Sequence, residues 1–186
     1  DGTMTVYTGT QSIYDDHKGI VGVLGVAPEK VNVVSAYVGG GFGGKEDLIV
    51  QHHAALLAWK SGAPVKVTLD RQESIRVHPK RHAMEMEYVV AADAEGRVTA
   101  VKASILADTG AYASLGGPVL QRACTHGAGP YAIPNVEMTG TGVYTNNPPG
   151  GAFRGFGVTQ SCFAIESCLN LLAREVGVSP WEIRWR

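Results

Sequence analysis

The most informative part of the sequence is residues 38–47, which read Val-Gly-Gly-Gly-Phe-Gly-Gly-Lys-Glu-Asp. Clustered glycine usually means that the backbone turns sharply or approaches a ligand closely. The stretch follows residues 31–38, a β-branched run that predicts a buried strand, and precedes a helix predicted from about Asp47 to Gly62. A glycine loop in that position exposes backbone N–H groups, and the start of a helix favours anions. The sequence therefore predicts a loop that can present its backbone to an anionic ligand.

The same loop formally matches the pattern GxGxxG, which marks dinucleotide-binding turns when it lies between a strand and a helix. Such a turn needs an acidic residue about 20 residues further on, to hold a ribose. The nearest candidate is Asp70, which lies farther away. A nucleotide-binding domain without redox chemistry therefore stays open as the weaker interpretation.

Around the loop, the hydrophobic pattern predicts both strands and helices. Further strands are predicted at residues 3–10, 65–70, 82–92, 97–107 and 135–145. Residues 93–96 (Asp-Ala-Glu-Gly) are typical of a turn, so the strands at residues 82–92 and 97–107 are predicted to form a hairpin. Helices are predicted at residues 13–26 and around Leu120–Thr125. The predicted fold class is α+β, with mixed sheets covered by helices on one face.

The last predicted helix has the clearest pattern. Its apolar face is formed by residues that step by three and four, namely Cys162, Ile165, Leu169, Leu172 and Val176. Thr159 is the predicted cap at its start, and Gly177 the predicted residue at its end. Ser179-Pro180 then opens another helix, and the sequence stops at Arg186 soon afterwards. We therefore expect residues 1–186 to be part of a longer domain, truncated at the C-terminal end.

Composition and charge narrow the classes of function. The 186 residues carry a formal net charge of -1, with 45% hydrophobic and 18% charged residues. This composition supports a buried core and leaves no basic surface for nucleic acid; no apolar run reaches the roughly 18 residues of a membrane span. Cys124, Cys162 and Cys168 are an odd and sparse set, which argues against a disulfide framework, a zinc site or an iron–sulfur cluster held by this chain. Reduced thiols and a cytoplasmic protein are expected.

Residues 38–47 resemble a signature of the xanthine dehydrogenase and aldehyde oxidase family, in which this loop contacts molybdopterin. Other stretches agree with that family in the same order along the chain. They are Thr10-Gln11-Ser12, residues 69–73 (Leu-Asp-Arg-Gln-Glu), residues 107–112 (Ala-Asp-Thr-Gly-Ala-Tyr), residues 131–135 (Tyr-Ala-Ile-Pro-Asn), residues 152–157 (Ala-Phe-Arg-Gly-Phe-Gly) with Gln160, and residues 179–184. The resemblance implies that residues 1–186 are the N-terminal part of the cofactor-binding region of the large subunit.

Members of this family hydroxylate a carbon next to a ring nitrogen, or an aldehyde carbon, with water as the oxygen source. The resemblance implies a molybdenum–molybdopterin cofactor, of which a cytosine dinucleotide form is one variant, and FAD and [2Fe-2S] centres in partner subunits or domains. The general-base glutamate of the family lies downstream of the part that this chain matches. We therefore expect no catalytic residue and no direct metal ligand in residues 1–186, because molybdenum is held through the pterin, and we expect the isolated chain to be inactive.

The family implies five cofactor contacts: Gln11, Gly40, Gly41, Phe42 and Arg154. The Gln11 amide can donate to an oxygen ligand of molybdenum without adding charge, and glycine lets the backbone come close. The Arg154 guanidinium matches oxyanionic groups by paired hydrogen bonds. The structural alternatives are a surface polar residue, a tight turn without a ligand, and a salt-bridged arginine.

The family also implies three substrate contacts: Glu46, Arg122 and Phe156. A glutamate and an arginine occupy the positions of Glu46 and Arg122 in xanthine-oxidising members, and aldehyde-oxidising relatives usually lack one or both. A carboxylate and a guanidinium on opposite sides can hold a ring that accumulates negative charge, and Phe156 can pack against that ring. The structural alternatives are an acid at a helix start, a surface cation and a core phenylalanine.

The resemblance therefore implies a hydroxylase that acts on a purine-like heterocycle such as xanthine or hypoxanthine. An aldehyde or nicotinate-type hydroxylase of the same family stays open, as does a non-catalytic assembly module descended from it. The implied partners are the heterocyclic substrate, iron–sulfur and FAD subunits, and the remainder of the large subunit. Neither nucleic acid nor a membrane is an expected partner.

Overall fold

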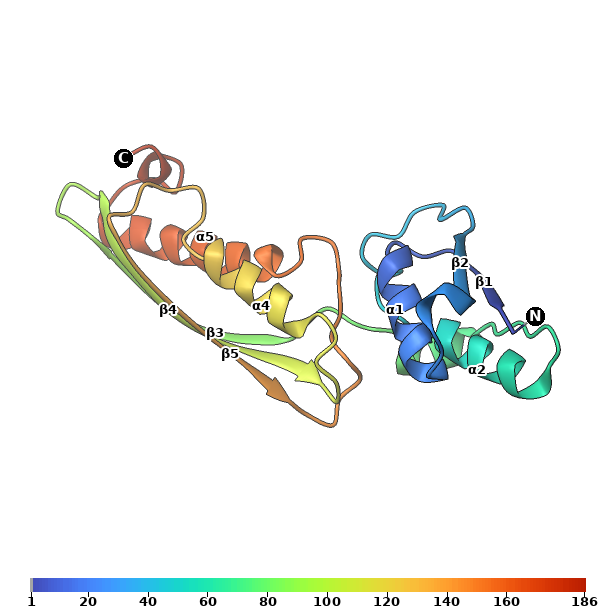
Figure 1. Ribbon diagram of the computed structural model, residues 1–186. Coiled ribbons are helices and arrows are strands. Elements are labelled where there is room, and N and C mark those ends of the chain that lie inside the picture. The colour runs from blue at the N-terminus through green and yellow to red at the C-terminus, as the bar shows by residue number, and fades with distance from the viewer. Residues whose placement is uncertain (1) are drawn as a thin grey trace. The chain divides into compact units, whose positions relative to one another are not determined.

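The computed structural model describes residues 2–186 and confirms the α+β class (Figure 1). The chain divides into two compact units. The first unit consists of the chain up to Lys80 together with Gly151–Arg154, and the second consists of Arg81–Gly150 and Gly155–Arg186. A short piece of the second glycine-rich stretch therefore belongs to the first unit.

The first unit is built on a parallel strand–helix–strand arrangement. Its elements are β1 (Met4–Thr8), α1 (Ile13–Leu24), η1 (Pro28–Lys30), β2 (Val31–Ser35), α2 (Gln51–Ser61) and α3 (Arg71–Val77). β1 pairs with β2 in parallel, with Val6 opposite Val33. Val6, Ile20, Val31 and Ala55 form its buried core, where each large aliphatic side chain contributes about 1.5–3 kcal/mol by burial.

Two predictions for the first unit were wrong. The strand predicted at residues 65–70 is absent, because this stretch pairs with no strand among residues 2–186 and leads into α3. Asp70 instead caps α3: its side chain accepts from Glu73 N, and the Glu73 side chain accepts from Asp70 N, each at 2.8 Å. The helix predicted from Asp47 begins at Gln51, since the residues before it form turns.

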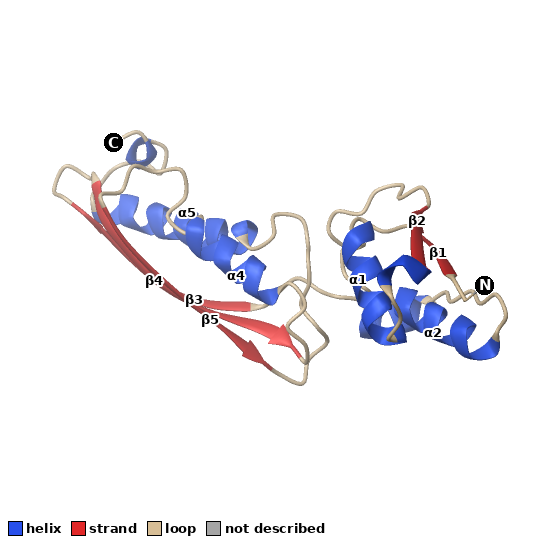
Figure 2. Ribbon diagram, in the orientation of Figure 1, coloured by secondary structure: helices blue, strands red, loops and turns tan. Residues whose placement is uncertain are grey.

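The second unit is a mixed sheet covered by helices. Its elements are β3 (Met84–Ala92), β4 (Val98–Gly110), α4 (Gly116–Thr125), β5 (Asn135–Tyr144), α5 (Val158–Glu175) and η2 (Glu182–Arg184). β3 runs antiparallel to β4, as predicted for the hairpin, and β5 runs parallel to β4. α4 and α5 lie on the same face of this sheet, with the strands red and the helices blue in Figure 2. The expected arrangement of helices on one face is therefore confirmed here.

The core of the second unit follows from alternation along β4 and periodicity along α5. Val101, Ala103, Ile105 and Ala107 are buried, and the residues between them face outward. Ile165 and Leu169 of α5 pack into the core beside Val101, and Ile183 of the C-terminal turn joins them. The short helix predicted near Leu120 is real and longer than expected, since it begins at Gly116.

The ends of α5 show what its sequence pattern did not reveal. Thr159 is not its cap: the helix starts at Val158 after Gly157, and the Thr159 hydroxyl accepts from Arg81 at 2.7 Å. Cys162 was assigned to the buried face but is exposed. Gly177 does end the helix as predicted, in a left-handed conformation with Val178 N donating to Ala173 O at 2.9 Å. Across residues 2–186, the helices are too short or too polar for any of them to cross a membrane.

Candidate functional site

The glycine loop of the first unit carries three consecutive backbone donors that are not used internally. The N–H groups of Gly40, Gly41 and Phe42 donate to no acceptor within residues 2–186. Gly40 has a φ of 110° and Phe42 a φ of 54°, so the backbone changes direction at each of them. Successive amides in such a turn can converge on an anion. The loop therefore has free backbone donors where the sequence predicts a backbone site, and the binding of a ligand there stays a prediction.

Gln11 organises this loop from the segment between β1 and α1. Its Oε1 accepts from Gly43 N at 3.0 Å and from Lys45 N at 3.2 Å, and its own backbone N–H donates to Lys45 O at 2.8 Å. Both partners of the side-chain amide are donors, so the atom between them must be the oxygen. The Nε2 group consequently points its two donors elsewhere, and within the described chain no acceptor takes them.

The absence of a side chain at Gly41 lets Gln11 lie against the loop. A Cβ atom at residue 41 would lie 2.7 Å from Gln11 Cγ and closer still to the amide group. Real Cβ atoms essentially never come so close, so any larger residue would displace Gln11. The sequence pattern indicated close approach to a ligand here, and the structure shows that the glycine also accommodates a protein side chain.

Residues 151–154 pack directly against the glycine loop. Arg154 N donates to Phe42 O at 3.0 Å, and Ala152 N donates to Asp47 Oδ2 at 3.3 Å. A Cβ at Gly43 would lie 2.8 Å from the carbonyl carbon of Ala152. Two motifs that are more than 100 residues apart thus form one surface, which brings Arg154 beside the other residues predicted for the cofactor. Asp47 is a further member of this surface, although its sequence position indicated only the start of a helix after the glycine loop.

In the second unit, two of the predicted substrate residues lie together. The guanidinium carbon of Arg122, on α4, is 5.0 Å from the centre of the Phe156 ring, a distance at which a cation is attracted to an aromatic face. Gly157 allows this arrangement, because a Cβ there would lie 3.0 Å from Ala123 N and closer still to Val119 O. The third predicted substrate residue, Glu46, is half-buried in the first unit. Its pairing with Arg122 therefore stays a prediction.

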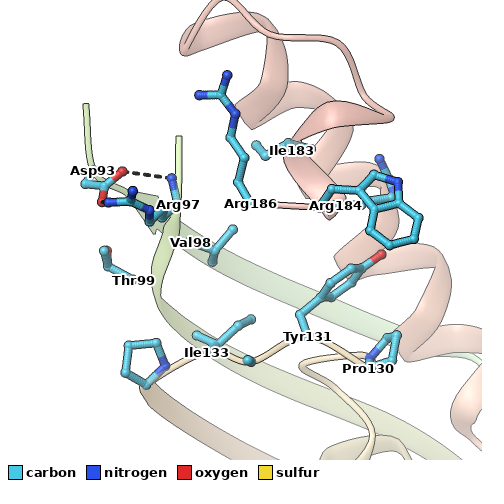
Figure 3. Close-up of a pocket in the computed structure, with 13 residues that line it drawn as sticks. Asp93, Arg97, Val98, Thr99, Pro130, Tyr131, Ile133, Ile183, Arg184 and Arg186 are labelled. Carbon is cyan, nitrogen blue, oxygen red and sulfur yellow. Dashed lines mark hydrogen bonds and ion pairs between the residues drawn. The ribbon is translucent and has the colours of Figure 1, made fainter. Parts of the chain in front are cut away.

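A cavity of about 500 Å³ lies in the second unit, between the turn before β4, the loop before β5 and the C-terminal turn (Figure 3). Val98, Tyr131, Ile133 and Ile183 are among its lining residues, and none of the predicted site residues is. Two of its polar groups already have a protein partner: the Tyr131 hydroxyl donates to Glu166 Oε1 at 2.6 Å, and Arg184 pairs with Glu166 at 2.6 Å. The predicted site is therefore not this cavity.

Comparison with known sequences identifies the class of protein that combines this fold with this loop. The profile of the molybdopterin cofactor-binding domain matches residues 1–186. The chain therefore belongs to the molybdopterin cofactor-binding domain family, which is found in the large subunits of xanthine dehydrogenase and aldehyde oxidoreductase relatives.

Individual relatives agree with this assignment. The chain is 46% identical over 184 residues to a “Probable xanthine dehydrogenase” subunit of Bacillus subtilis, covering 99% of this chain and 25% of that protein. It is equally identical over 184 residues to the “Nicotinate dehydrogenase large molybdopterin subunit” of Eubacterium barkeri, covering 99% of this chain and 43% of that protein. The aldehyde oxidoreductase structure from Desulfovibrio gigas matches with a TM-score of 0.92 and 32% identity, over 97% of this chain and 20% of that chain. The chain thus spans a quarter to less than half of these curated relatives.

Proposed function

We propose that the glycine loop, Gln11 and Arg154 hold the molybdenum–molybdopterin cofactor of a hydroxylase. The observation that carries this proposal is the set of unused donors on one surface: three loop N–H groups and the Gln11 amide nitrogen. The N–H groups of Gly40, Gly41 and Phe42 suit the oxyanionic groups of a pterin phosphate. The Gln11 amide suits an oxygen ligand of molybdenum, because it donates without adding charge. When bound, the cofactor supplies oxidative hydroxylation with water as the oxygen source.

The substrate that we propose is a purine-like N-heterocycle such as xanthine or hypoxanthine. Arg122 and Phe156 support this, because a cation beside an aromatic ring can hold a flat, electron-rich heterocycle by stacking and charge. Glu46 would bind the opposite edge of the ring. An aldehyde-oxidising site has less need of two opposed charges, because its substrate does not accumulate charge around a ring.

A second candidate substrate is nicotinate or a related heterocycle. The relative from Eubacterium barkeri that is named for nicotinate is as similar to this chain as the relative named for xanthine. Arg122 could pair with the carboxylate of such a substrate, since a guanidinium matches a carboxylate in a bidentate manner. The two candidates differ in what Glu46 would contact: a ring N–H in a purine, and no equivalent donor in nicotinate.

The remaining parts of the enzyme would lie outside residues 1–186. We propose that this chain is the N-terminal part of the cofactor-binding region of a large subunit, since its relatives are two to four times longer. The general-base glutamate would come from the downstream part, and the electrons would leave through [2Fe-2S] and FAD centres in partner subunits or domains. A cytosine dinucleotide form of the pterin is one variant that the same proposal includes. It also includes a cytoplasmic location, because the three cysteines of the chain are all free.

Variants of Gln11 in the intact enzyme test the cofactor role. Gln11→Glu keeps an oxygen that accepts from Gly43 N and Lys45 N but loses the outward donor. We expect turnover to fall by roughly 10²–10³, the usual effect of removing one positioned donor, while hydrogen exchange of the Gly43 and Lys45 amides stays near wild type. Gln11→Met should lose both turnover and amide protection. Full activity in Gln11→Glu would contradict the proposed contact with the cofactor.

Glu46→Val and Arg122→Met test the substrate class. Each should reduce purine turnover by roughly 10- to 100-fold, because an unpaired buried polar group costs about 1–3 kcal/mol. Turnover of an aldehyde by the same variants should change little. Steady-state kinetics with xanthine, nicotinate and an aldehyde measure the difference. Equal losses for all substrates would contradict the assigned roles, and a loss confined to nicotinate in Arg122→Met would favour the second candidate.

A further inference from the structure

A buried carboxylic acid lies in the first unit, between the segment that precedes α1 and the start of α2. Asp16, on α1, has no exposed surface, although it follows the exposed Asp15. Asp is almost never fully buried unless its carboxyl group has partners. The core residue Ile20 lies one turn further along the same helix. Asp16 thus occupies a position that packing alone would fill with an apolar side chain.

One partner of Asp16 connects it to the start of α2. Gln51 is buried, and its Nε2 donates to Asp16 Oδ2 at 3.2 Å. The other end of the same amide accepts from Ile49 N at 2.8 Å and from Val50 N at 2.9 Å. These two N–H groups precede the helix and have no partner within it. Asp16 therefore orients the Gln51 amide, which in turn holds the backbone of Ile49 and Val50.

A second partner connects Asp16 to the Gln11 segment. Thr10 is buried, its hydroxyl interacts with the Asp16 carboxyl, and the same hydroxyl lies 3.4 Å from Lys45 O and accepts from Ser12 N at 3.0 Å. A hydroxyl has one proton, so it can donate either to Asp16 or to Lys45 O. If Asp16 is neutral and donates to Thr10, the Thr10 proton is free to hold Lys45 O.

The surroundings of Asp16 favour that neutral form. Asp16 Oδ1 makes no hydrogen bond within the described chain and is sealed from solvent. Burial raises the pKa of Asp16, the Thr10 and Gln51 hydrogen bonds oppose this, and the Asp15 charge adds to it, so that the pKa lies above its usual value. An ionised carboxylate with an unpartnered oxygen would be far more costly than a neutral acid in this position.

We propose that Asp16 is a positioning residue that sets the geometry of the cofactor-binding loop, by holding Thr10 on one side and Gln51 on the other. Lys45 is tied to Thr10 and Gln11, and the Ile49–Val50 turn is tied to Gln51. Both ends of residues 45–50, which follow the glycine loop, are thus linked to the buried Asp16 carboxyl through Thr10 and Gln51. The proposed effect on cofactor binding rests on the proposed function, whereas the geometry of the loop can be measured without any cofactor.

The test uses three variants of the intact enzyme. Asp16→Leu keeps the branching at Cγ, adds some volume and removes every polar contact. Asp16→Asn keeps a neutral group that accepts from Gln51 and donates to Thr10. Ile20→Ala is the matched control, because it disturbs the same helix and the same core but removes no hydrogen-bonding group. Hydrogen exchange of the Gly43 and Lys45 amides, melting temperature, and molybdenum and pterin content are measured for each.

We expect Asp16→Leu to exchange the Gly43 and Lys45 amides about tenfold faster than wild type and to lose most of its molybdenum and pterin. Asp16→Asn should restore both properties to within about twofold. Ile20→Ala should lower the melting temperature while leaving these two amides protected.

Other outcomes separate the inference from the proposed function. Unchanged exchange in Asp16→Leu, or equally fast exchange in Ile20→Ala, would overturn the positioning role. Fast exchange with normal molybdenum content would leave the positioning role standing and contradict the proposed cofactor loop. If Asp16→Leu does not fold, a failure of Asp16→Asn to keep the amides protected overturns the inference on its own.

Discussion

The two glycine-rich stretches of this chain look alike in sequence and do different work in the structure. In residues 39–44, the backbone leaves the N–H groups of Gly40 and Gly41 open on the surface of the first unit. In residues 150–157, the backbone packs against other protein groups: a Cβ at Gly151 would lie 2.5 Å from Pro79 Cβ, and one at Gly157 would lie 3.0 Å from Ala123 N. The first stretch presents donors at Gly40 and Gly41 and packs against backbone only further on, at Gly43, whereas the second packs against other segments at Gly151 and Gly157.

This difference shows that glycine content marks close approach without saying what is approached. At Gly41 the neighbour is the end of a flexible side chain, that of Gln11, which can move away. At Gly157 the neighbours are backbone atoms of α4, which cannot move without shifting the helix. Substitution should therefore affect the site at one position and the fold at the other.

The largest effect is expected for Gly157→Ala. The new Cβ meets the backbone of α4 at a residue whose φ is 97°, so overpacking and strain together should cost about 3–5 kcal/mol. Thermal or denaturant unfolding of the intact enzyme measures the loss. Gly117→Ala is the matched control, because Gly117 lies in α4, the helix that Gly157 contacts, and has nothing within 4 Å of the added atom. Wild-type stability in Gly157→Ala would remove the distinction between the two stretches.

A smaller effect on stability, but a large one on the site, is expected for Gly41→Ala. The new methyl group should displace the Gln11 side chain and break its hydrogen bonds to Gly43 and Lys45. Molybdenum and pterin content should fall severalfold or more, while unfolding changes by only about 1–2 kcal/mol.

Gly39→Asn is the comparison for Gly41→Ala. Residue 39 has a φ of 66° and open space around it, and Asn tolerates this conformation. Cofactor content should therefore stay near wild type. If both variants lost the cofactor equally, a change in loop flexibility would explain the effect, rather than displacement of the Gln11 side chain.

The smallest effect is expected for Gly22→Ala, which tests whether a glycine in this chain is dispensable when it approaches nothing. Gly22 lies inside α1 with nothing within 4 Å of an added Cβ. Alanine should raise stability by about 0.5–1 kcal/mol, because it restricts the unfolded chain and favours the helix. A rise in melting temperature with unchanged activity would support this, and a loss of activity would reveal a role for the open space.

Most elements could be predicted because each depends on local pattern. The β3–β4 hairpin and α5 were recognised from alternation and from three–four spacing. Residues 65–70 have the same alternation as a strand, but no partner strand lies beside them in the described chain. α2 starts at Gln51 rather than at the predicted Asp47. The Asp47 side chain accepts from the distant Ala152 N, and the Gln51 side chain accepts from Ile49 N just before the helix. Long-range partners of this kind leave no local signal.

The motifs indicated which residues form the candidate site, but they gave no signal for the buried residues Asp16 and Gln51. Gln11, Gly41 and Arg154 were singled out in advance, and the structure brings them together on one surface of the first unit. The sequence did not indicate that Asp16 and Gln51 are buried, because charged and polar residues of a helix are usually exposed to solvent. The acidic pair Asp15-Asp16 gives no hint that one carboxyl is exposed and the other is sealed.

The amino-acid sequence by itself determined the elements, the family and the positions where the backbone must come close to something, because these follow from side-chain period and from the lack of a Cβ atom. Only the tertiary structure decided what each glycine approaches, which side of α1 is buried, and which N–H groups stay unused. Those properties depend on contacts between residues far apart in the chain, and hydrogen-bond partners across such separations are fixed by packing rather than by local sequence.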